Sequence, residues 1–343
     1  MSAVHRVRLP VGATVLVEAG HRVEPAEVLA TRRPPGAGVT IPVAVPLRRS
    51  AADAREALEV TPGSVLEADA LLARQGSREV RVPDACLFLA YDADDGTALI
   101  APLGATEPIL GHVRGEVASV AADAIEIRVD GALVTGIAGS GAAVHGELRV
   151  AVHDPGEELR AGAIDVGATG RILVGGSRAS AETLTRARAM GVAGIVLAGA
   201  LDKELRDFDA AQRRRRQIGG ARGAFSILLL EGYGKTSFDP ALFAWFRAHD
   251  GRMASLFGDG ARLYVYDAEP VPGRRALPRP GDRVIAHRRP SAGATGVLVR
   301  EVPASYAAAS GVAARSALVR FDDARTAIVP LANLEAAEPR SEA

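Results

Sequence analysis

Two residue types are scarce in this sequence, and each scarcity excludes a kind of chemistry. Of the 41 lysines and arginines only Lys203 and Lys235 are lysines, and Cys86 is the only cysteine. One cysteine cannot form an internal disulfide bond or the thiolate cluster of a metal site. Because Cys86 lies in the apolar run DACLFLAY, we expect a buried and unreactive thiol.

Aromatic residues and long apolar runs are also scarce. Phe, Trp and Tyr make up only 4% of the chain, so Val, Leu, Ile and Ala must fill its cores. This composition is typical of many short strands joined by tight turns. No apolar run reaches the roughly 18 residues of a membrane span, and the N-terminus lacks the layout of a signal peptide. We therefore expect no membrane span and a cytoplasmic location.

Length and charge set the remaining bounds. A chain of 343 residues is long enough for two or three domains. Its formal net charge of zero gives no reason to expect a polyanionic partner for the chain as a whole. A local basic patch that binds such a partner is still compatible with this net charge. The seven histidines have no spacing typical of a metal site, and no Gly-x-Ser-x-Gly motif occurs. We expect no metal and no cofactor, and no catalytic residue is indicated.

Strands alternate with helices between residues 166 and 270. RILVGG, GIVLAG and FSILLLEG are expected strands, and ASAETLTRARAM, LDKELRDFDAAQRRRRQ and PALFAWFRAH are expected helices. Ser180 should cap the first helix, Gly191 should end it, and Asp239-Pro240 should begin the third. This alternation predicts a small parallel sheet covered by helices, a central three-layer α/β domain.

The N-terminal region is typical of short strands instead. In VEAGHRVEPAEVLA a glycine turn precedes a valine and a leucine on one face of a strand. The phrase resembles the barrel-sandwich hybrid of lipoyl and biotinyl carriers, a barrel that also occurs in Rnf-type electron-transport proteins. The matching positions are Val17, Gly20, Val23, Glu27 and Leu29. GHVRGEVASVAADAIEIR resembles the other half of that barrel.

The resemblance implies a hybrid barrel made of residues 1–48 and 105–165. Residues 49–104 are then an insertion with a short helix and a hairpin, in which CLFLAY and TALIAPL flank the turn DADDG. VDG at 129–131 is typical of a further hairpin turn. A carrier needs an exposed lysine for its cofactor, and no lysine precedes Lys203, so we expect no covalent biotin or lipoate.

The stretch EGYGKTSFD contains Gly-Lys-Thr after an apolar strand, which suggests a phosphate loop at Gly232, Gly234, Lys235 and Thr236. A Walker A loop needs a glycine at position 229 and a helix directly after the lysine, but position 229 is Leu229. A glycine turn before a capped helix is the favoured interpretation. Upstream, residues 171–199 resemble a swivelling, protease-associated type of α/β unit, and GGSR in that stretch is expected to be a plain turn between strand and helix.

The C-terminal region follows a linker rich in proline and arginine, residues 271–282. Residues 283–337 contain four or five short strands, and GDRV followed by GATGV resembles the start of an SH3-like barrel of the KOW type. Ten arginines against four acidic residues give residues 271–330 a net charge of +6. The candidate contacts with an anion or a nucleic acid are Arg274, Arg275, Arg288 and Arg289.

Taken whole, the chain resembles an uncharacterised bacterial family with this domain order, and that resemblance implies no activity. The expected fold is multidomain and β-rich: a barrel-sandwich hybrid, a central three-layer α/β domain and a C-terminal SH3-like barrel. We expect a non-catalytic binding or scaffold protein that contacts nucleic acid or a partner complex. Two alternatives remain open: an accessory subunit of an enzyme assembly, and an α/β enzyme that acts on a phosphate-bearing ligand.

Overall fold

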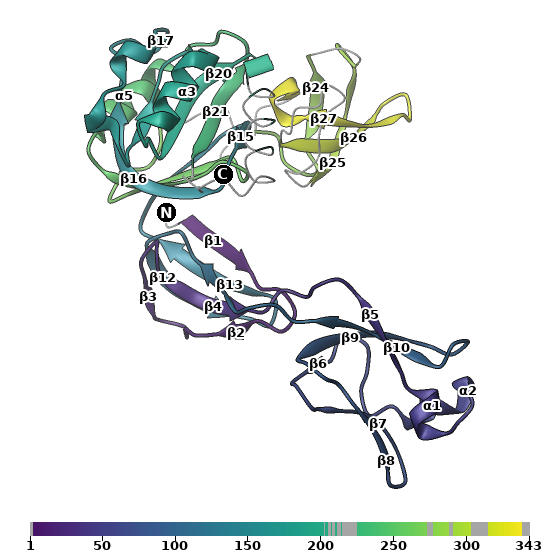
Figure 1. Cartoon of the computed structure of the whole chain (residues 1–343). Coiled ribbons are helices and arrows are strands. Elements are labelled where there is room, and N and C mark those ends of the chain that lie inside the picture. The colour runs from purple at the N-terminus through teal and green to yellow at the C-terminus, as the bar shows by residue number, and fades with distance from the viewer. Residues whose placement is uncertain are drawn as a thin grey trace. The chain divides into compact units, whose positions relative to one another are not determined.

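The structure is a computed structural model that describes residues 3–201, 225–272, 277–287, 291–302 and 315–337, together with residues 203, 204, 207, 210 and 214. As predicted, these residues are β-rich and form several sheets (Figure 1). The chain divides into two compact units. One comprises His5–Gly111 and Glu116–Ile127, and the other comprises Met1–Val4, His112–Gly115 and Arg128–Ala343. No helix among the described residues is long and apolar enough to cross a membrane.

Seven short strands, most of whose residues lie in the first unit, form two sheets with the orders β1-β13-β12-β3 and β11-β4-β2. They are β1 (Ala3–Arg8), β2 (Thr14–Val15), β3 (Arg22–Val23), β4 (Val28–Arg32), β11 (Glu107–Leu110), β12 (Gly115–Val120) and β13 (Ala124–Val129). The predicted glycine turn is present, because Gly20 has φ +88° and its N–H donates to the Val117 carbonyl at 2.8 Å. Val23 and Leu29 are fully buried, as the phrase requires.

The inserted segment has a buried core of its own. Its sheet has the order β5-β10-β9-β6, and β7 pairs with β8 as a separate hairpin. The elements are β5 (Val39–Pro42), β6 (Val65–Leu66), β7 (Leu71–Gln75), β8 (Arg78–Arg81), β9 (Cys86–Asp92), β10 (Thr97–Pro102) and the short helices α1 (Ala44–Leu47) and α2 (Ala51–Ala54). The predicted DADDG hairpin joins β9 to β10. Cys86 is buried in this core, and burial raises the pKa of its thiol.

The start of this segment needs correction. We predicted residues 1–48 to belong to the barrel, but Val43 and Leu47 pack in the same buried cluster as Phe88 and Ile100. Strand β5 also pairs with β10. The inserted module therefore begins near residue 39, because the short helix α1 supplies apolar side chains that only this core can bury.

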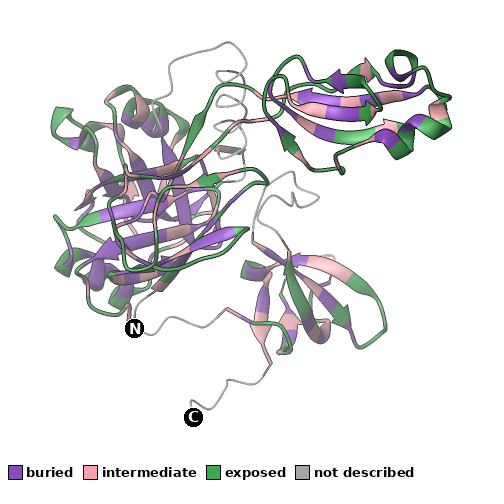
Figure 2. Cartoon of the chain, turned by 90° about the horizontal axis from the view of Figure 1, so that it is seen from below, coloured by how far each residue is buried: buried purple, intermediate pink, exposed green. Residues whose placement is uncertain are grey.

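The second unit contains a mixed sheet of eight strands with the order β14-β23-β22-β16-β18-β20-β21-β15. The strands are β14 (Gly131–Thr135), β15 (Ala138–Ser140), β16 (Ala143–Val150), β18 (Ile172–Val174), β20 (Gly194–Ala200), β21 (Ser226–Tyr233), β22 (Met253–Phe257) and β23 (Arg262–Tyr266). Four of them, β16, β18, β20 and β21, are parallel. All seven residues of β20 are buried, and Figure 2 shows buried residues concentrated in this sheet.

Two predictions are wrong at this sheet. Residues 131–165 do not continue the barrel, because β14 pairs with β23, and β16 pairs with β22 and β18. Leu159 and Ile164 also pack in the core of this sheet, so the α/β domain begins well before the predicted residue 166. VDG is not a hairpin turn, because β13 and β14 lie in different sheets. The glycine serves another purpose: a Cβ at Gly131 would collide with the carbonyl of Val265 on β23. Alternating apolar strands look alike in sequence, whichever sheet they join.

The two helices described in this unit follow their predicted signals. Ser180 caps α3 (Ala181–Ala189) by accepting from the Thr183 N–H, and Gly191 follows the helix with φ +74°. Asp239 caps α5 (Pro240–Ala248) by accepting from two N–H groups, with proline in the first turn. The third predicted helix, LDKELRDFDAAQRRRRQ, lies for the most part outside the described residues.

The C-terminal region is a separate antiparallel sheet of five strands with the order β27-β26-β25-β24-β28. Its strands are β24 (Arg283–Ala286), β25 (Thr295–Val302), β26 (Ser316–Phe321), β27 (Thr326–Pro330) and β28 (Leu334–Ala336). Val284, Leu298, Val319 and Phe321 form the centre of its small core. The last strand returns to pair with the first, so the sheet curls around these side chains.

Candidate ligand sites of the α/β unit

The carboxyl ends of the parallel strands meet at one edge of the eight-stranded sheet. Ligands of open α/β sheets bind outside this edge, because the loops that follow the strands converge there. Backbone hydrogen bonds join these loops to one another. They run from Ser177 to Glu157 (2.7 Å), from Gly199 to Ser177 (3.0 Å), from Gly234 to Ala200 (2.8 Å) and from Phe238 to Pro155 (3.2 Å), each N–H donating to a carbonyl.

A cavity of about 210 Å³ lies beside the end of β16. Arg149 and Leu173 are register partners on β16 and β18, so their side chains face the same side of the sheet. The segment that contains Ala163, Asp165 and Ala168 lines the same cavity. Its apolar lining includes Val152, Leu173 and Ala168, all of which are buried.

Three polar side chains line the cavity from its exposed rim: Arg149, His153 and Asp165. In the described part of the chain, none of the three side chains makes a hydrogen bond or an ion pair. Two neighbouring arginines, unlike Arg149, form ion pairs: Arg171 pairs with Glu147 at 3.5 Å, and Arg178 pairs with Glu158 at 3.0 Å. The cavity therefore offers a guanidinium, an imidazole and a carboxylate that have no hydrogen-bond or ion-pair partner in the described part of the chain.

The carboxylates that follow His153 in sequence belong to a turn. The His153 backbone N–H donates to Glu157 Oε2 at 2.8 Å. This bond is the main reason that the pKa of Glu157 is lowered from its ordinary value. Glu158 belongs to the two-stranded pair of β17 (Glu158–Leu159) and β19 (Arg178–Ala179). These carboxylates stabilise the loop, and no acid–base pair is formed by them.

The GGSR segment at 175–178 is likewise a structural turn. Its arginine is held by Glu158, and the Ser177 hydroxyl donates to the Glu157 carbonyl at 3.1 Å. Gly176 has φ +68°, and a Cβ there would collide with the Glu157 carbonyl. The glycine is therefore needed for close packing of two loops.

The predicted phosphate-loop residues Gly232, Gly234, Lys235 and Thr236 lie at this same edge. Strand β21 ends at Tyr233 and helix α5 begins at Pro240, several residues too late for a Walker A loop. Gly234 has φ +98°, in keeping with the predicted glycine turn. Lys235 is exposed.

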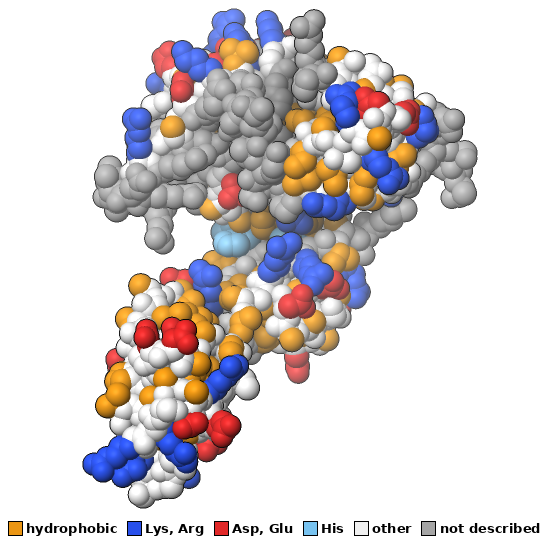
Figure 3. Space-filling view, turned by 90° about the vertical axis from the view of Figure 1, so that its right-hand side faces the viewer, with side chains coloured by type: hydrophobic (Ala, Val, Ile, Leu, Met, Phe, Trp, Pro, Cys, Tyr) orange, Lys and Arg blue, Asp and Glu red, His pale blue; other side chains and the backbone are white. Residues whose placement is uncertain are grey.

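The four arginines predicted to contact nucleic acid, Arg274, Arg275, Arg288 and Arg289, lie outside the described residues, as does most of the basic run 213–216. In the C-terminal region, three arginines in or next to the five-stranded sheet are ion-paired: Arg283 with Asp322, Arg315 with Glu301 and Arg325 with Asp323. In the described part, Arg300 and Arg320 make no ion pair. Figure 3 shows basic, acidic and hydrophobic side chains intermixed on the side it presents.

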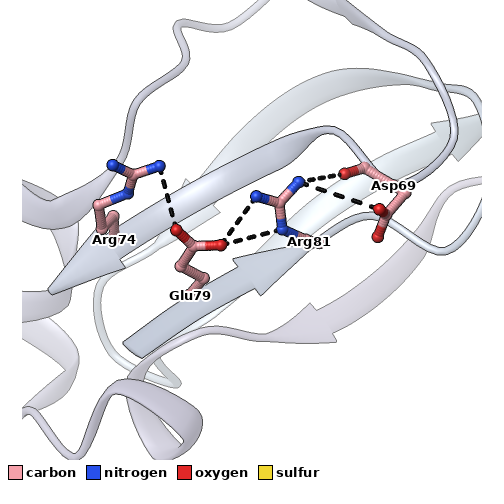
Figure 4. Close-up of polar contacts among 4 residues, drawn as sticks. All are labelled: Asp69, Arg74, Glu79 and Arg81. Atoms are coloured by element: carbon pink, nitrogen blue, oxygen red, sulfur yellow. Dashed lines mark hydrogen bonds and ion pairs between the residues drawn. The ribbon is translucent and has the colours of Figure 1, made fainter. Parts of the chain in front are cut away.

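Charged residues of the inserted hairpin β7–β8 pair with one another (Figure 4). Glu79 contacts Arg74 at 3.0 Å and Arg81 at 2.8 Å, and Arg81 Nη1 donates to the Asp69 carbonyl at 2.7 Å. The hydrogen bond with Arg81 lowers the pKa of Glu79 and raises the pKa of Arg81. These charged groups bind one another and stabilise the hairpin, so they are poor candidates for a binding site.

The cavity residues carry no motif that sequence reasoning could have detected. They come from two neighbouring strands and a connecting loop, so their proximity follows from the β16–β18 pairing, which we did not predict. Among the described residues, no group of three His, Cys, Asp or Glu side chains is placed to hold a metal. No family model matches the chain. No curated protein matches it either.

Proposed function

We propose that this protein is a non-catalytic binding protein whose α/β unit holds a small organic anion in the cavity beside β16. One observation carries the proposal: the side chains of Arg149, His153 and Asp165 line a cavity of about 210 Å³ and make no hydrogen bond or ion pair in the described part of the chain. Apolar pockets with a few convergent polar groups are the usual form of small-molecule sites.

The side chains define the chemical class of the ligand. The planar guanidinium of Arg149 suits a carboxylate or a phosphate group. Asp165 accepts hydrogen bonds, so it suits a hydroxyl or an amino group on the same ligand. A cavity of about 210 Å³ has room for roughly seven water-sized groups. The ligand is therefore a small hydroxy or amino acid, or a phosphate ester of similar size.

A thermal-shift screen of the full chain against small hydroxy acids, amino acids and phosphate esters tests this proposal. A ligand at about 100 times its Kd should add about 2.7 kcal/mol of stability. Arg149→Ala and Asp165→Ala should abolish the shift. Arg171→Ala is the matched control, because Arg171 directly precedes the neighbouring strand β18 but is already paired with Glu147. The proposal fails if nothing in the screen shifts the wild type, or if Arg171→Ala has the same effect as Arg149→Ala.

A second candidate function, contact with nucleic acid, is favoured by two arginines of the five-stranded sheet. Arg300 on β25 is the register partner of Leu318 on β26, so these two side chains lie on the same face of the sheet. Arg320 is two residues after Leu318 on β26 and therefore lies on that face too, which is the face opposite the core. The four arginines predicted from the sequence, at 274, 275, 288 and 289, lie outside the described residues. Filter binding of RNA and DNA at rising salt tests this function. Each of Arg300→Ala and Arg320→Ala should lower the salt slope by about 1, and the ion-paired Arg325→Ala should leave it unchanged.

The finer fold assignments are part of the same proposal. The two facing sheets around Val23 and Leu29 support a barrel-sandwich hybrid interrupted by the inserted module. Helices α3 and α5 beside the parallel strands support a three-layer α/β domain. The return of β28 to β24 supports an SH3-like barrel. The resemblance to an uncharacterised family with this domain order is also part of this proposal.

A further inference from the structure

The loop after β21 presents several hydrogen-bond donors that have no partner in the described part of the chain. The backbone N–H groups of Lys235, Thr236 and Ser237 make no hydrogen bond in the described part of the chain. The hydroxyl groups of Thr236 and Ser237 and the Lys235 ammonium also make no hydrogen bond in the described part of the chain. Three consecutive residues therefore offer both backbone and side-chain donors to a ligand.

Other hydroxyl groups of the same unit are occupied. Within the α/β unit, hydroxyls that make hydrogen bonds belong to Thr169, Ser177, Ser180, Thr183, Thr185, Ser226 and Ser255. Against this background, the unused hydroxyls of Thr236 and Ser237 are exceptional. They also follow directly on a lysine, in a chain that has only two.

The backbone around Gly199 explains how the loop is held. The Gly234 N–H donates to the Ala200 carbonyl at 2.8 Å. The Gly234 carbonyl lies so close to Gly199 that a Cβ there would be 2.5 Å from the oxygen. Because the C=O and N–H of one planar trans peptide point in opposite directions, the Lys235 N–H points away from Gly199. The first of the three donors is therefore directed away from strand β20.

We propose that the loop Gly234–Ser237 binds a phosphate group. Successive backbone N–H groups around a glycine turn form anion-binding concavities, and hydroxyl groups and an ammonium complete the donor set. This arrangement differs from a Walker A loop, because the next helix begins only at Pro240 and its first N–H groups are bonded by Asp239. The site shares no lining residue with the cavity beside β16, so the two proposals are tested separately.

The scarcity of lysine provides a direct experiment. The full chain is acetylated with a water-soluble amine reagent, and mass spectrometry follows Lys235 and Lys203, both exposed, as separate sites. Inorganic phosphate and glycerol 3-phosphate are added in parallel arms, with sodium chloride at matched ionic strength. At about ten times Kd, a ligand should slow acetylation of Lys235 about tenfold and leave Lys203 unchanged. The arm that protects better identifies free phosphate or a phosphate ester as the preferred form.

Equal rates at Lys235 with and without both phosphates would overturn the proposal, as would equal slowing of Lys203. A second measurement removes the dependence on lysine chemistry. Phosphate affinity, measured by isothermal titration calorimetry, should weaken at least several-fold in Thr236→Val and Lys235→Gln. Lys203→Gln is the matched charge control and should leave the affinity unchanged. Unchanged affinity in both loop variants would also refute the site.

Discussion

Strands β20 and β26 show how differently two sheets of one chain are built. In β20, GIVLAGA, every residue is buried. In β26, SALVRF, the central residues alternate: Leu318 is half-buried, Val319 is buried and Arg320 is exposed. Parallel strands are covered on both faces and need continuous apolar sequence, whereas an antiparallel sheet leaves one face open to polar residues. The two patterns thus record which sheet has a free face.

This difference also separates the two kinds of candidate site. Where both faces of a sheet are covered, side chains in mid-strand have no access to ligand, and only the strand ends remain. The cavity at β16 and the loop at 234–237 both lie at such ends. Where one face is open, side chains in mid-strand are themselves available, and Arg300 and Arg320 are of this type.

The largest expected effect comes from alanine substitutions at three consecutive positions in each strand. In β20, Ile195→Ala and Leu197→Ala should each cost about 2–5 kcal/mol, and Val196→Ala, on the opposite face, should also be strongly destabilising. In β26, Val319→Ala alone should be strongly destabilising, while Leu318→Ala and Arg320→Ala should each cost less than about 1 kcal/mol. Hydrogen exchange resolved by segment measures each sheet separately.

The pattern of losses decides the comparison. If Leu318→Ala destabilises as much as Val319→Ala, the outer face of the five-stranded sheet is covered, and the arginines on it are not free to bind. If Val196→Ala is tolerated while its neighbours are not, one face of the parallel strands is open instead.

Local signals in the sequence were sufficient for much of the fold. Ser180 and Asp239 predict their helix starts because a cap acts within three residues, and DADDG predicts its hairpin for the same reason. The assignment of strands to sheets depends on distant partners, so residues 131–165 were misplaced. The cavity was missed for the same reason. Arg149 and Asp165 line one cavity because β16 pairs with β18, and the sequence does not show that pairing.

A smaller effect is expected from glycines that allow close approach in the two sheets. A Cβ at Gly199 would lie 2.5 Å from the Gly234 carbonyl, and one at Gly296 would lie 2.5 Å from the Arg320 carbonyl. Alanine at either position should cost about 1–3 kcal/mol, because backbone rather than a flexible side chain must move. Hydrogen exchange of the affected strands measures the loss.

The control for these substitutions is Gly162→Ala, because nothing lies within 4 Å of a Cβ there. Its stability should stay within about 0.5 kcal/mol of the wild type. If Gly199→Ala is equally harmless, the loop after β21 can shift without loss, and its donors are not held in place for a ligand. Gly296→Ala then reports whether the antiparallel sheet is the less tolerant of the two.

The smallest expected effect is a pH dependence that only the second unit's eight-stranded sheet should show. His112 packs edge-on against Phe257 of β22, with ring centroids 6.4 Å apart. Burial, and to a lesser extent the charge of His145, lowers the pKa of His112 below its ordinary 6.5. Between the folded and unfolded pKa values the unfolded chain binds more protons, so stability should fall as pH drops below about 6.5.

A His112→Gln variant should flatten this pH dependence, because it removes the titrating group. His145→Gln should leave most of it, since burial is the larger cause of the shift. Hydrogen exchange of β22 and of β26 at pH about 7 and about 5 provides the measurement, with rates corrected for intrinsic exchange. If β26 loses protection as much as β22 does, the effect is global and His112 is not its source. If β22 alone loses protection, and does so less in His112→Gln, the pH response belongs to the eight-stranded sheet.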